Sequence, residues 1–270
     1  MMAVVQSTGR DAMIQIAAHP RAFPHNGLTR GELALILIDM QRDFLEPEGY
    51  LAAMGYDLAG VRAAIGPARH LLAAARGAGL CILHTRQGYR PDLAEVPAHK
   101  LARIRAGVSS VGKAGPLGRF LIRGEPGFQI IADVAPAPGE FVIDKTANSA
   151  FWGTDLAAIL AARGIRALIL AGVTTDVCVH CTLREANDRG FECVLARDAC
   201  GSGDAEAHRA GLHMVTVEDG VFGALADASA IVAALDRMDR APAASVPAPP
   251  AAAAPAPSNE PPADLGDWSI

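Results

Sequence analysis

Short apolar runs alternate along this chain with longer stretches in which apolar residues recur at helical spacing. The helical spacing predicts helices at Leu58–Ala78, Asp155–Arg163, Val179–Arg189 and Ala224–Leu235. The apolar runs predict six strands, at Leu33–Ile38, Leu80–His84, Phe141–Ile143, Ala167–Ala171, Glu192–Ala196 and Met214–Val217. Strands that alternate with helices form a parallel sheet with helices on both faces. We therefore expect a three-layer (α/β/α), Rossmann-like domain around a mostly parallel six-stranded sheet, with any site at the carboxyl ends of its strands.

The two ends of the chain and one internal segment depart from this pattern. Residues 1–30 show little periodicity and predict an N-terminal arm that lies on the domain, at 31–240, or on a neighbouring subunit. Residues 241–270 are rich in Pro and Ala and predict an extended or disordered tail. Residues 86–138 are long and irregular, which is typical of a segment that forms the wall or the lid of an active site.

Composition narrows the class of function. The chain has 270 residues, of which 51% are hydrophobic, and a formal net charge of -5 with both signs mixed along it. Nothing in this balance favours nucleic acid or an anionic membrane surface as a partner, so we expect a small-molecule substrate. The five cysteines are odd in number and lie mostly in predicted strands or helices, which favours a reduced, cytoplasmic protein. The N-terminus has charged residues without a long apolar run, so we expect no signal peptide, and no apolar stretch is long enough to span a bilayer.

Cys178 stands where a predicted strand and a Gly/Thr turn meet a predicted helix. At a helix N-terminus, unpaired backbone N–H groups and the helix dipole favour a thiolate. The same N–H groups can bind an oxyanion. One turn would then supply both a nucleophile and an oxyanion hole.

Two further reactive groups follow predicted strands. Asp39 comes after Leu33–Ile38, and Lys145 comes after the strand that contains Phe141–Ile143. A charged group often ends a strand only because solvent begins there, but an acid, an amine and a thiol at one sheet edge favour catalysis. We expect Cys178 to attack a carbonyl, Asp39 to take its proton and deliver it to the leaving amine, and Lys145 to favour the thiolate and hold Asp39. The backbone N–H groups of Thr174 and Cys178 would bind the oxyanion.

These motifs resemble the isochorismatase-like cysteine hydrolases over about residues 30–238. The resemblance rests on DMQRDF at 39–44, on the lysine after the Ile-Asp pair at 143–144 and on GVTTDVC at 172–178. It implies a catalytic triad of Asp39, Lys145 and Cys178 and a cis peptide bond between Val173 and Thr174. It also implies hydrolysis without a cofactor and a homo-oligomer, either a dimer or a tetramer.

Within this family the chain is most similar to the biuret hydrolase branch, through GYDL (55–58), HTRQGYRPDLA (84–94), RGEPG (123–127) and TTDVCVHCTLREANDRGFEC (174–193). This implies ammonia release from a small, linear, urea-like amide through a thioester-type intermediate. Asn148 stands where the branch has a second lysine, and Glu218 stands where it has a glutamine. Both changes make the pocket less positive, so we expect biuret or its cationic relative guanylurea as the substrate, with ureidoacrylate-type and other small amides next. Phe44 and Phe151 are candidates for the pocket wall.

Other readings of the sequence stay open. Cys178 and Cys181 match a dithiol redox pattern, and a binding module that has lost its chemistry would keep the same pocket. Nicotinamidases of the superfamily carry an Asp-x-His metal site where this chain has His84-Thr85-Arg86-Gln87, so we expect no metal and an interior role for His84. No Gly-x-Gly-x-x-Gly follows the first strand, so no nucleotide cofactor is implied.

Overall fold

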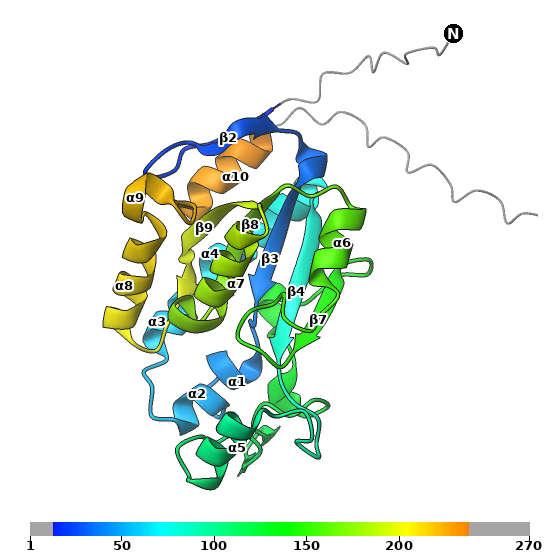
Figure 1. Cartoon of the computed structure of the whole chain (residues 1–270), viewed down its shortest axis with the longest axis vertical. Coiled ribbons are helices and arrows are strands. Elements are labelled where there is room, and N and C mark those ends of the chain that lie inside the picture. The colour runs from blue at the N-terminus through cyan, green and yellow to red at the C-terminus, as the bar shows by residue number, and fades with distance from the viewer. Residues whose placement is uncertain (1–12, 238–270) are drawn as a thin grey trace, which may run out of the picture. The chain divides into compact units, whose positions relative to one another are not determined.

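A six-stranded parallel sheet forms the centre of the structure, a computed structural model that describes residues 13–237 (Figure 1). Its strand order is β10-β9-β8-β3-β4-β7, and every neighbouring pair is parallel. The strands are β3 (Leu33–Ile38), β4 (Cys81–Gln87), β7 (Phe141–Lys145), β8 (Ala167–Val173), β9 (Glu192–Gly201) and β10 (Ala224–Ala226). The predicted fold class is confirmed.

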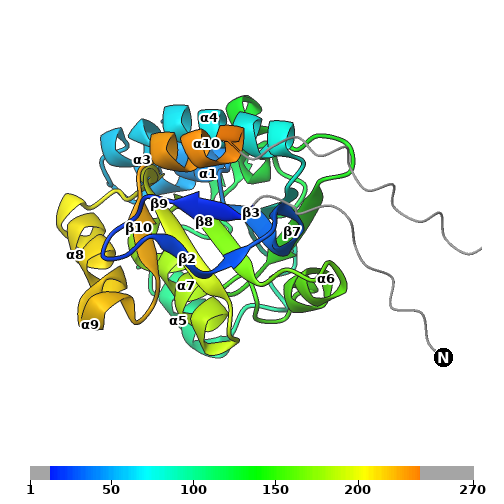
Figure 2. The same cartoon turned by 90° about the horizontal axis from the view of Figure 1, so that it is seen from above.

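Helices cover both faces of this sheet, as Figure 2 shows. On one face lie α3 (Ala59–Ala63), α4 (Ile65–Ala78) and α10 (Ala228–Arg237), and on the other lie α6 (Leu156–Ala162), α7 (His180–Asp188) and α8 (Ala205–Val215). Alternate residues of a strand point to opposite faces. Accordingly Leu35 of β3 belongs to the apolar core that contains Leu71 of α4, whereas Ile36 belongs to the core that contains Leu183 of α7. No helix among residues 13–237 is long and apolar enough to cross a membrane.

The last strand and the last helix differ from the prediction. The segment Met214–Val217 is not a strand: it spans the end of α8 and the start of α9 (Val217–Gly220). The edge strand is instead Ala224–Ala226, which was predicted as the first turn of the last helix, and it pairs with residues 194–196 of β9. Apolar runs this short have no periodicity that separates a strand from a buried helical turn, so only pairing with a neighbour decides between them.

The described part of the N-terminal arm lies on the domain. Strands β1 (Ile14–Ile16) and β2 (Phe23–Leu28) form an antiparallel pair. Between them, the N–H and C=O groups of His19 each form a 2.8 Å hydrogen bond with Leu225 of β10. The arm therefore covers the edge of the sheet within its own chain. Residues 1–12 and the predicted tail at 241–270 are outside the described residues.

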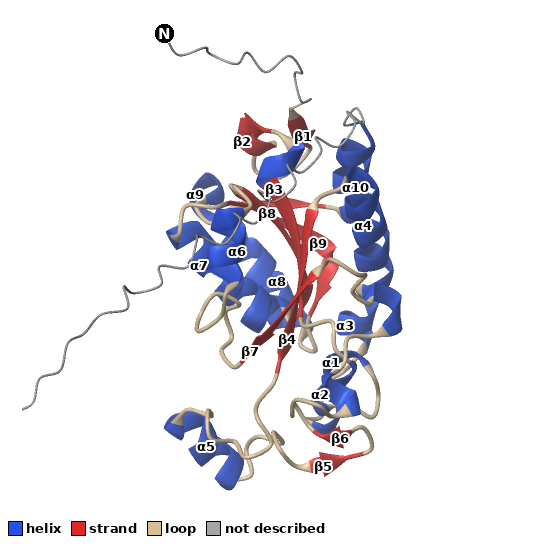
Figure 3. Cartoon of the chain, turned by 90° about the vertical axis from the view of Figure 1, so that its right-hand side faces the viewer, coloured by secondary structure: helices blue, strands red, loops and turns tan. Residues whose placement is uncertain are grey.

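The long segment after β4 lies beyond the carboxyl ends of the strands, together with the helices that follow β3 (Figure 3). Asp43 is completely buried and joins the two parts, because its Oδ2 accepts a 2.8 Å hydrogen bond from the N–H of Leu121. The elements here are α1 (Arg42–Leu45), α2 (Tyr50–Ala53), α5 (Ala98–Arg105), β5 (Ala114–Gly115), β6 (Gly118–Arg119) and the 3-10 turns Pro126–Phe128 and Ala132–Val134.

Glu140, just before β7, links two layers of the domain. Its carboxylate accepts a 2.7 Å hydrogen bond from Arg76 of α4 and lies 2.8 Å from Nε2 of His84 in β4. His84 is therefore an interior histidine, as predicted. Burial alone would raise the pKa of Glu140, but the hydrogen bonds from Arg76, the N–H of Ala137 and His84 outweigh it and lower the pKa to about 2.

This pKa makes the contribution of Glu140 to stability depend on pH. A carboxylate with a lowered folded-state pKa stabilises the fold above its unfolded value, here 4.5, and loses this effect as the pH falls towards 2. We expect Glu140→Gln to lower the free energy of unfolding by about 1–3 kcal/mol at neutral pH and by progressively less below about pH 5. Unfolding by urea at several pH values from neutral to acidic measures the loss of free energy and its dependence on pH. The control is Asp133→Asn, since Asp133 is exposed and 3.8 Å from Arg69. An equal loss at every pH would contradict this account.

Candidate active site

The three predicted catalytic side chains meet at the carboxyl edge of the sheet. Asp39 follows β3, Lys145 ends β7, and Cys178 lies in η4 (Thr175–Val179), a single π-helical turn that joins β8 to α7. Because β4 lies between β3 and β7, Lys145 reaches across one strand to bring its Nζ to 2.7 Å from Oδ2 of Asp39. Both side chains of this ion pair are fully buried.

Asp39 is held by Thr85 at the end of the neighbouring strand. Thr85 donates a 2.6 Å hydrogen bond to Oδ1 of Asp39, and its own Oγ1 and C=O each lie 3.2 Å from the backbone N–H of Asp39. Asp39 has a left-handed backbone conformation, with φ of 50°, which turns the chain sharply out of β3. Oδ2 receives no hydrogen bond of regular geometry within residues 13–237 and faces the ammonium group. One oxygen thus anchors the carboxylate, and the other remains for proton transfer.

Lys145 is surrounded by acceptors. Its Nζ donates to Oε1 of Gln87 at 2.9 Å and to the carbonyl oxygens of Ala147 and Asn148 at 3.1 and 3.2 Å. Burial alone would lower the pKa of Lys145, but the charge of Asp39 and a hydrogen bond with it outweigh burial and raise it. The side chain is therefore a permanent cation.

Gln87 and Gln41 complete this network and were missed by the sequence analysis. Gln87 was considered only as a residue in place of a metal ligand, yet its side chain binds Lys145. Its backbone N–H donates a 2.6 Å hydrogen bond to Oε1 of Gln41, and Nε2 of Gln41 donates to the carbonyl oxygens of Gln87 and Phe128. Gln41 stands within the DMQRDF motif, so its position next to Asp39 was the available signal.

Burial of Cys178 favours a neutral thiol at rest over the thiolate expected at the helix N-terminus. Cys178 is 7% exposed, and burial raises its pKa to about 12. The charge of Lys145 lowers this pKa, whereas the charge of Asp39 acts in the same direction as burial. Desolvation and a neighbouring carboxylate therefore outweigh the cation. Asp39 is placed to take the proton when Cys178 attacks.

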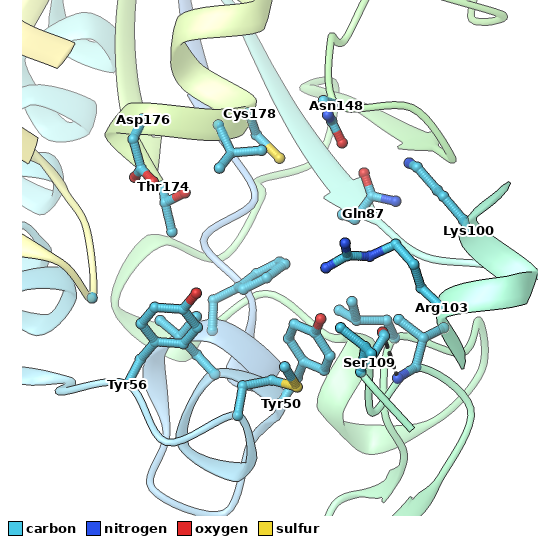
Figure 4. Close-up of a pocket in the computed structure, with 18 of the residues that line it drawn as sticks. Tyr50, Tyr56, Gln87, Lys100, Arg103, Ser109, Asn148, Thr174, Asp176 and Cys178 are labelled. Carbon is cyan, nitrogen blue, oxygen red and sulfur yellow. Dashed lines mark hydrogen bonds between the residues drawn. The ribbon is translucent and has the colours of Figure 1, made fainter. Parts of the chain in front are cut away.

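The turn before Cys178 has the peptide geometry that the family resemblance implied. The bond between Val173 and Thr174 is cis. Thr174 and Cys178 both line one cavity of about 410 Å³, drawn in Figure 4. The carbonyl oxygen of Thr174 accepts hydrogen bonds from the N–H groups of Val177 and Val179, both at 3.2 Å, which tightens the turn.

Comparisons with known proteins agree with this geometry. A family model described as the isochorismatase domain matches residues 33–229. This chain belongs to the isochorismatase family.

The ureidoacrylate amidohydrolase RutB of Azorhizobium caulinodans is 31% identical over 200 residues, which are 73% of this chain and 88% of the relative. The crystal structure of a cysteine hydrolase from Pseudomonas syringae pv. phaseolicola 1448A is similar with a TM-score of 0.66 and 25% identity, over 77% of this chain and 94% of the other. The N-carbamoylsarcosine amidase of Thermoplasma acidophilum has a TM-score of 0.55 and 26% identity, over 73% of this chain and 96% of the other. Two of these relatives are thus named as an amidohydrolase and an amidase, and the third as a cysteine hydrolase.

The cavity of this family member contains some of the predicted substrate contacts. Phe44 and Asn148 line it, and Figure 4 shows Asn148 beside Cys178. Phe151 does not, because it stacks on Phe191 within the apolar core, with 5.9 Å between ring centroids. Glu218 does not either: it is exposed on α9, which lies near the amino ends of the strands (Figure 1). The remaining wall comes mainly from residues outside the three motifs that contain Asp39, Lys145 and Cys178: Tyr50, Leu51, Met54, Tyr56, Tyr89, Lys100, Arg103, Ile104, Val108, Ser109, Val111, Leu121, Ser202 and Gly203.

The interpretation of Cys178 and Cys181 as a dithiol redox pair is not supported. All five cysteines are unpaired. Cys181 is half-buried one turn after Cys178, and burial raises the pKa of its thiol. His180 points elsewhere, since its ring binds the carbonyl oxygen of Gly211 and Arg184. Residues 13–237 contain no group of three or more His, Cys, Asp or Glu side chains that could hold a metal ion, and Arg86 pairs with Asp144 at 2.7 Å.

A neutral resting thiol predicts how Cys178 responds to pH. With a pKa of about 12, the thiolate fraction rises about tenfold per pH unit, so alkylation by iodoacetamide should accelerate by that factor between about pH 7 and 9.5 without a plateau. The rate is measured by mass spectrometry of the peptide that contains Cys178. Asp39→Asn removes a charge that raises this pKa and should speed alkylation. A rate that is flat across this range would show a resting thiolate.

Proposed function

We propose that this protein hydrolyses a carbon–nitrogen bond of a small, linear, urea-like compound and releases ammonia, with Cys178 as the nucleophile. The proposal rests chiefly on one observation, the buried ion pair of Asp39 and Lys145 beside a cysteine that opens into a cavity. A cavity of about 410 Å³ suits a ligand of few atoms. The two relatives named for their substrates, a ureidoacrylate amidohydrolase and an N-carbamoylsarcosine amidase, support the same class of compound.

In the first half of the reaction the thiol of Cys178 adds to the substrate carbonyl carbon while its proton passes to Oδ2 of Asp39. The negative charge that develops on the carbonyl oxygen is bound by the backbone N–H groups of Thr174 and Cys178. A donor of this kind contributes about 3–4 kcal/mol to lowering the barrier. When the tetrahedral intermediate collapses, the carbon–nitrogen bond breaks, and the proton on Asp39 moves to the leaving nitrogen, which departs as ammonia.

In the second half a water molecule attacks the thioester-type intermediate. Asp39 takes one proton from this water and returns it to the sulfur of Cys178 as the carbon–sulfur bond breaks. Lys145 stays protonated throughout and compensates the charge of Asp39 each time that the carboxylate is restored. The proton that Cys178 loses to the leaving nitrogen is replaced by a proton from water. Each of the three side chains therefore ends the cycle in its starting state, and the cycle needs no cofactor.

The compounds of this class differ in charge, and the charges around the site distinguish among them as substrates. Biuret is neutral, guanylurea is a cation and ureidoacrylate is an anion. The expectation of guanylurea depended on a carboxylate at Glu218, and that side chain lies outside the cavity. Biuret and ureido acids are therefore better supported than guanylurea by the charges around the site.

Ammonia release from biuret, guanylurea, ureidoacrylate and nicotinamide tests the proposal. We expect release from at least one ureido compound and none from nicotinamide. Cys178→Ser, Asp39→Asn and Lys145→Met should each lower kcat by about a thousandfold or more, and double variants should be little worse, because the three side chains act as one unit. Cys181→Ser is the matched control and should keep its activity.

Three results would contradict the proposal. Turnover that survives Cys178→Ser would exclude the covalent step. Turnover that is lost equally in Cys178→Ser and Cys181→Ser would favour dithiol chemistry instead. Failure of the wild-type protein to release ammonia from any of these compounds would indicate a binding module or a different amide.

A further inference from the structure

Two cations of helix α5 lie on the cavity wall across from the nucleophile. Lys100 and Arg103 are three positions apart in the helix, so their side chains leave the same face. Both line the cavity that contains Cys178, and Figure 4 shows their charged ends directed into it. They belong to the long segment that the sequence analysis expected to form an active-site wall.

Neither cation is neutralised by the protein. Lys100 is half-buried, and its Nζ contacts only uncharged groups among the described residues: the hydroxyl of Tyr89 and the carbonyl oxygen of Thr146, both at 3.3 Å, and the ring of Tyr89, whose centroid is 5.9 Å away. The guanidinium group of Arg103 forms no hydrogen bond or ion pair with residues 13–237. Among residues 13–237 the one carboxylate that lines the cavity is that of Asp176, which lies beside Thr174 and away from Lys100 and Arg103 in Figure 4. The α5 side of the cavity is therefore positive.

Lys100 is half-buried and Arg103 is exposed, and keeping these two like charges on one helix face is unfavourable unless an anion binds there. Burial lowers the pKa of Lys100, and the charge of Lys145 acts in the same direction. A guanidinium fork and an ammonium group match a carboxylate, which can accept paired hydrogen bonds from arginine and one more from lysine. A cationic ligand would be repelled by the same wall.

Gln87 extends this polarity towards the triad. Its Oε1 accepts a hydrogen bond from Lys145, which leaves its amide nitrogen as a donor. Gln87 also lines the cavity, and Figure 4 shows it between Cys178 and the two cations. The cavity wall therefore carries hydrogen-bond donors from the catalytic centre to α5. These donors can bind acceptor groups along a substrate.

We propose that Lys100 and Arg103 form an anion subsite that binds a carboxylate at the end of the substrate remote from the scissile amide. This inference rests on the proposed function and narrows it: the preferred substrates are ureido carboxylic acids. It replaces the expectation, drawn from Asn148 and Glu218, that the pocket favours a cation.

The test compares 3-ureidopropionate with its uncharged methyl ester and with biuret. Arg103→Gln and Lys100→Gln should each raise KM for 3-ureidopropionate about tenfold or more, the scale of a charged hydrogen bond, with little change in kcat. The ester and biuret should be affected much less. Arg103→Glu should shift the preference towards guanylurea. Arg105→Gln is the control, because Arg105 is exposed on the same helix and does not line the cavity.

Binding to Cys178→Ser separates this inference from the proposed function. Calorimetry with 3-ureidopropionate should show that adding Arg103→Gln weakens affinity about tenfold or more, whether or not the wild-type protein turns the compound over. Equal effects of Arg103→Gln on the acid and on its ester, or none on either, would overturn the anion subsite and leave the amidohydrolase proposal intact. Absence of ammonia release with selective binding of the acid would overturn the proposed function alone.

Discussion

The buried ion pair between Asp39 and Lys145 is the interaction on which the rest of the site depends. Removing two charges from water costs several kcal/mol per ion, which their attraction offsets only when the remaining polar atoms are also paired. Thr85 binds one oxygen of the carboxylate, and Gln87 with two carbonyl oxygens binds the ammonium group. These contacts join the ends of three neighbouring strands, so the catalytic centre and the carboxyl edge of the sheet stabilise each other.

Burial of the pair also explains the state of the nucleophile. In a dry site the carboxylate and the desolvation of sulfur together keep Cys178 protonated, although a cation is adjacent. A neutral thiol beside a carboxylate that has one oxygen anchored is arranged for proton transfer during attack rather than before it. Electrostatic effects are stronger in such a medium, so the same desolvation that suppresses the thiolate strengthens every interaction with the developing oxyanion.

In the proposed mechanism, the residues that carry out the reaction and the residues that select the substrate lie on different parts of the chain. The triad stands on strand ends and on the turn before α7, whereas much of the opposite wall comes from α2, α5 and the chain around them. Anchors such as Asp43 hold this wall against the strand ends without belonging to the sheet. Relatives with the same sheet and a different wall can therefore act on different amides with one mechanism, because wall residues change without disturbing the ion pair.

Local order along the chain was enough to predict five of the six strands and to place the proposed triad at one edge of the sheet. Asp39, Lys145 and Cys178 could be assigned because each follows a buried strand, and parallel strands end at one edge whatever the helices do. The sequence also indicated the cis bond, through the family motif, and the long wall segment. Burial and distance between remote segments are not local, and they decided the rest. Only the tertiary structure showed that burial raises the pKa of Cys178, that 224–226 is a strand, and that Glu218 and Phe151 lie outside the cavity. The tertiary structure also showed the role of Gln87 and the direction of Lys100 and Arg103. A side chain faces a site only when the fold brings a remote segment of the chain opposite to it.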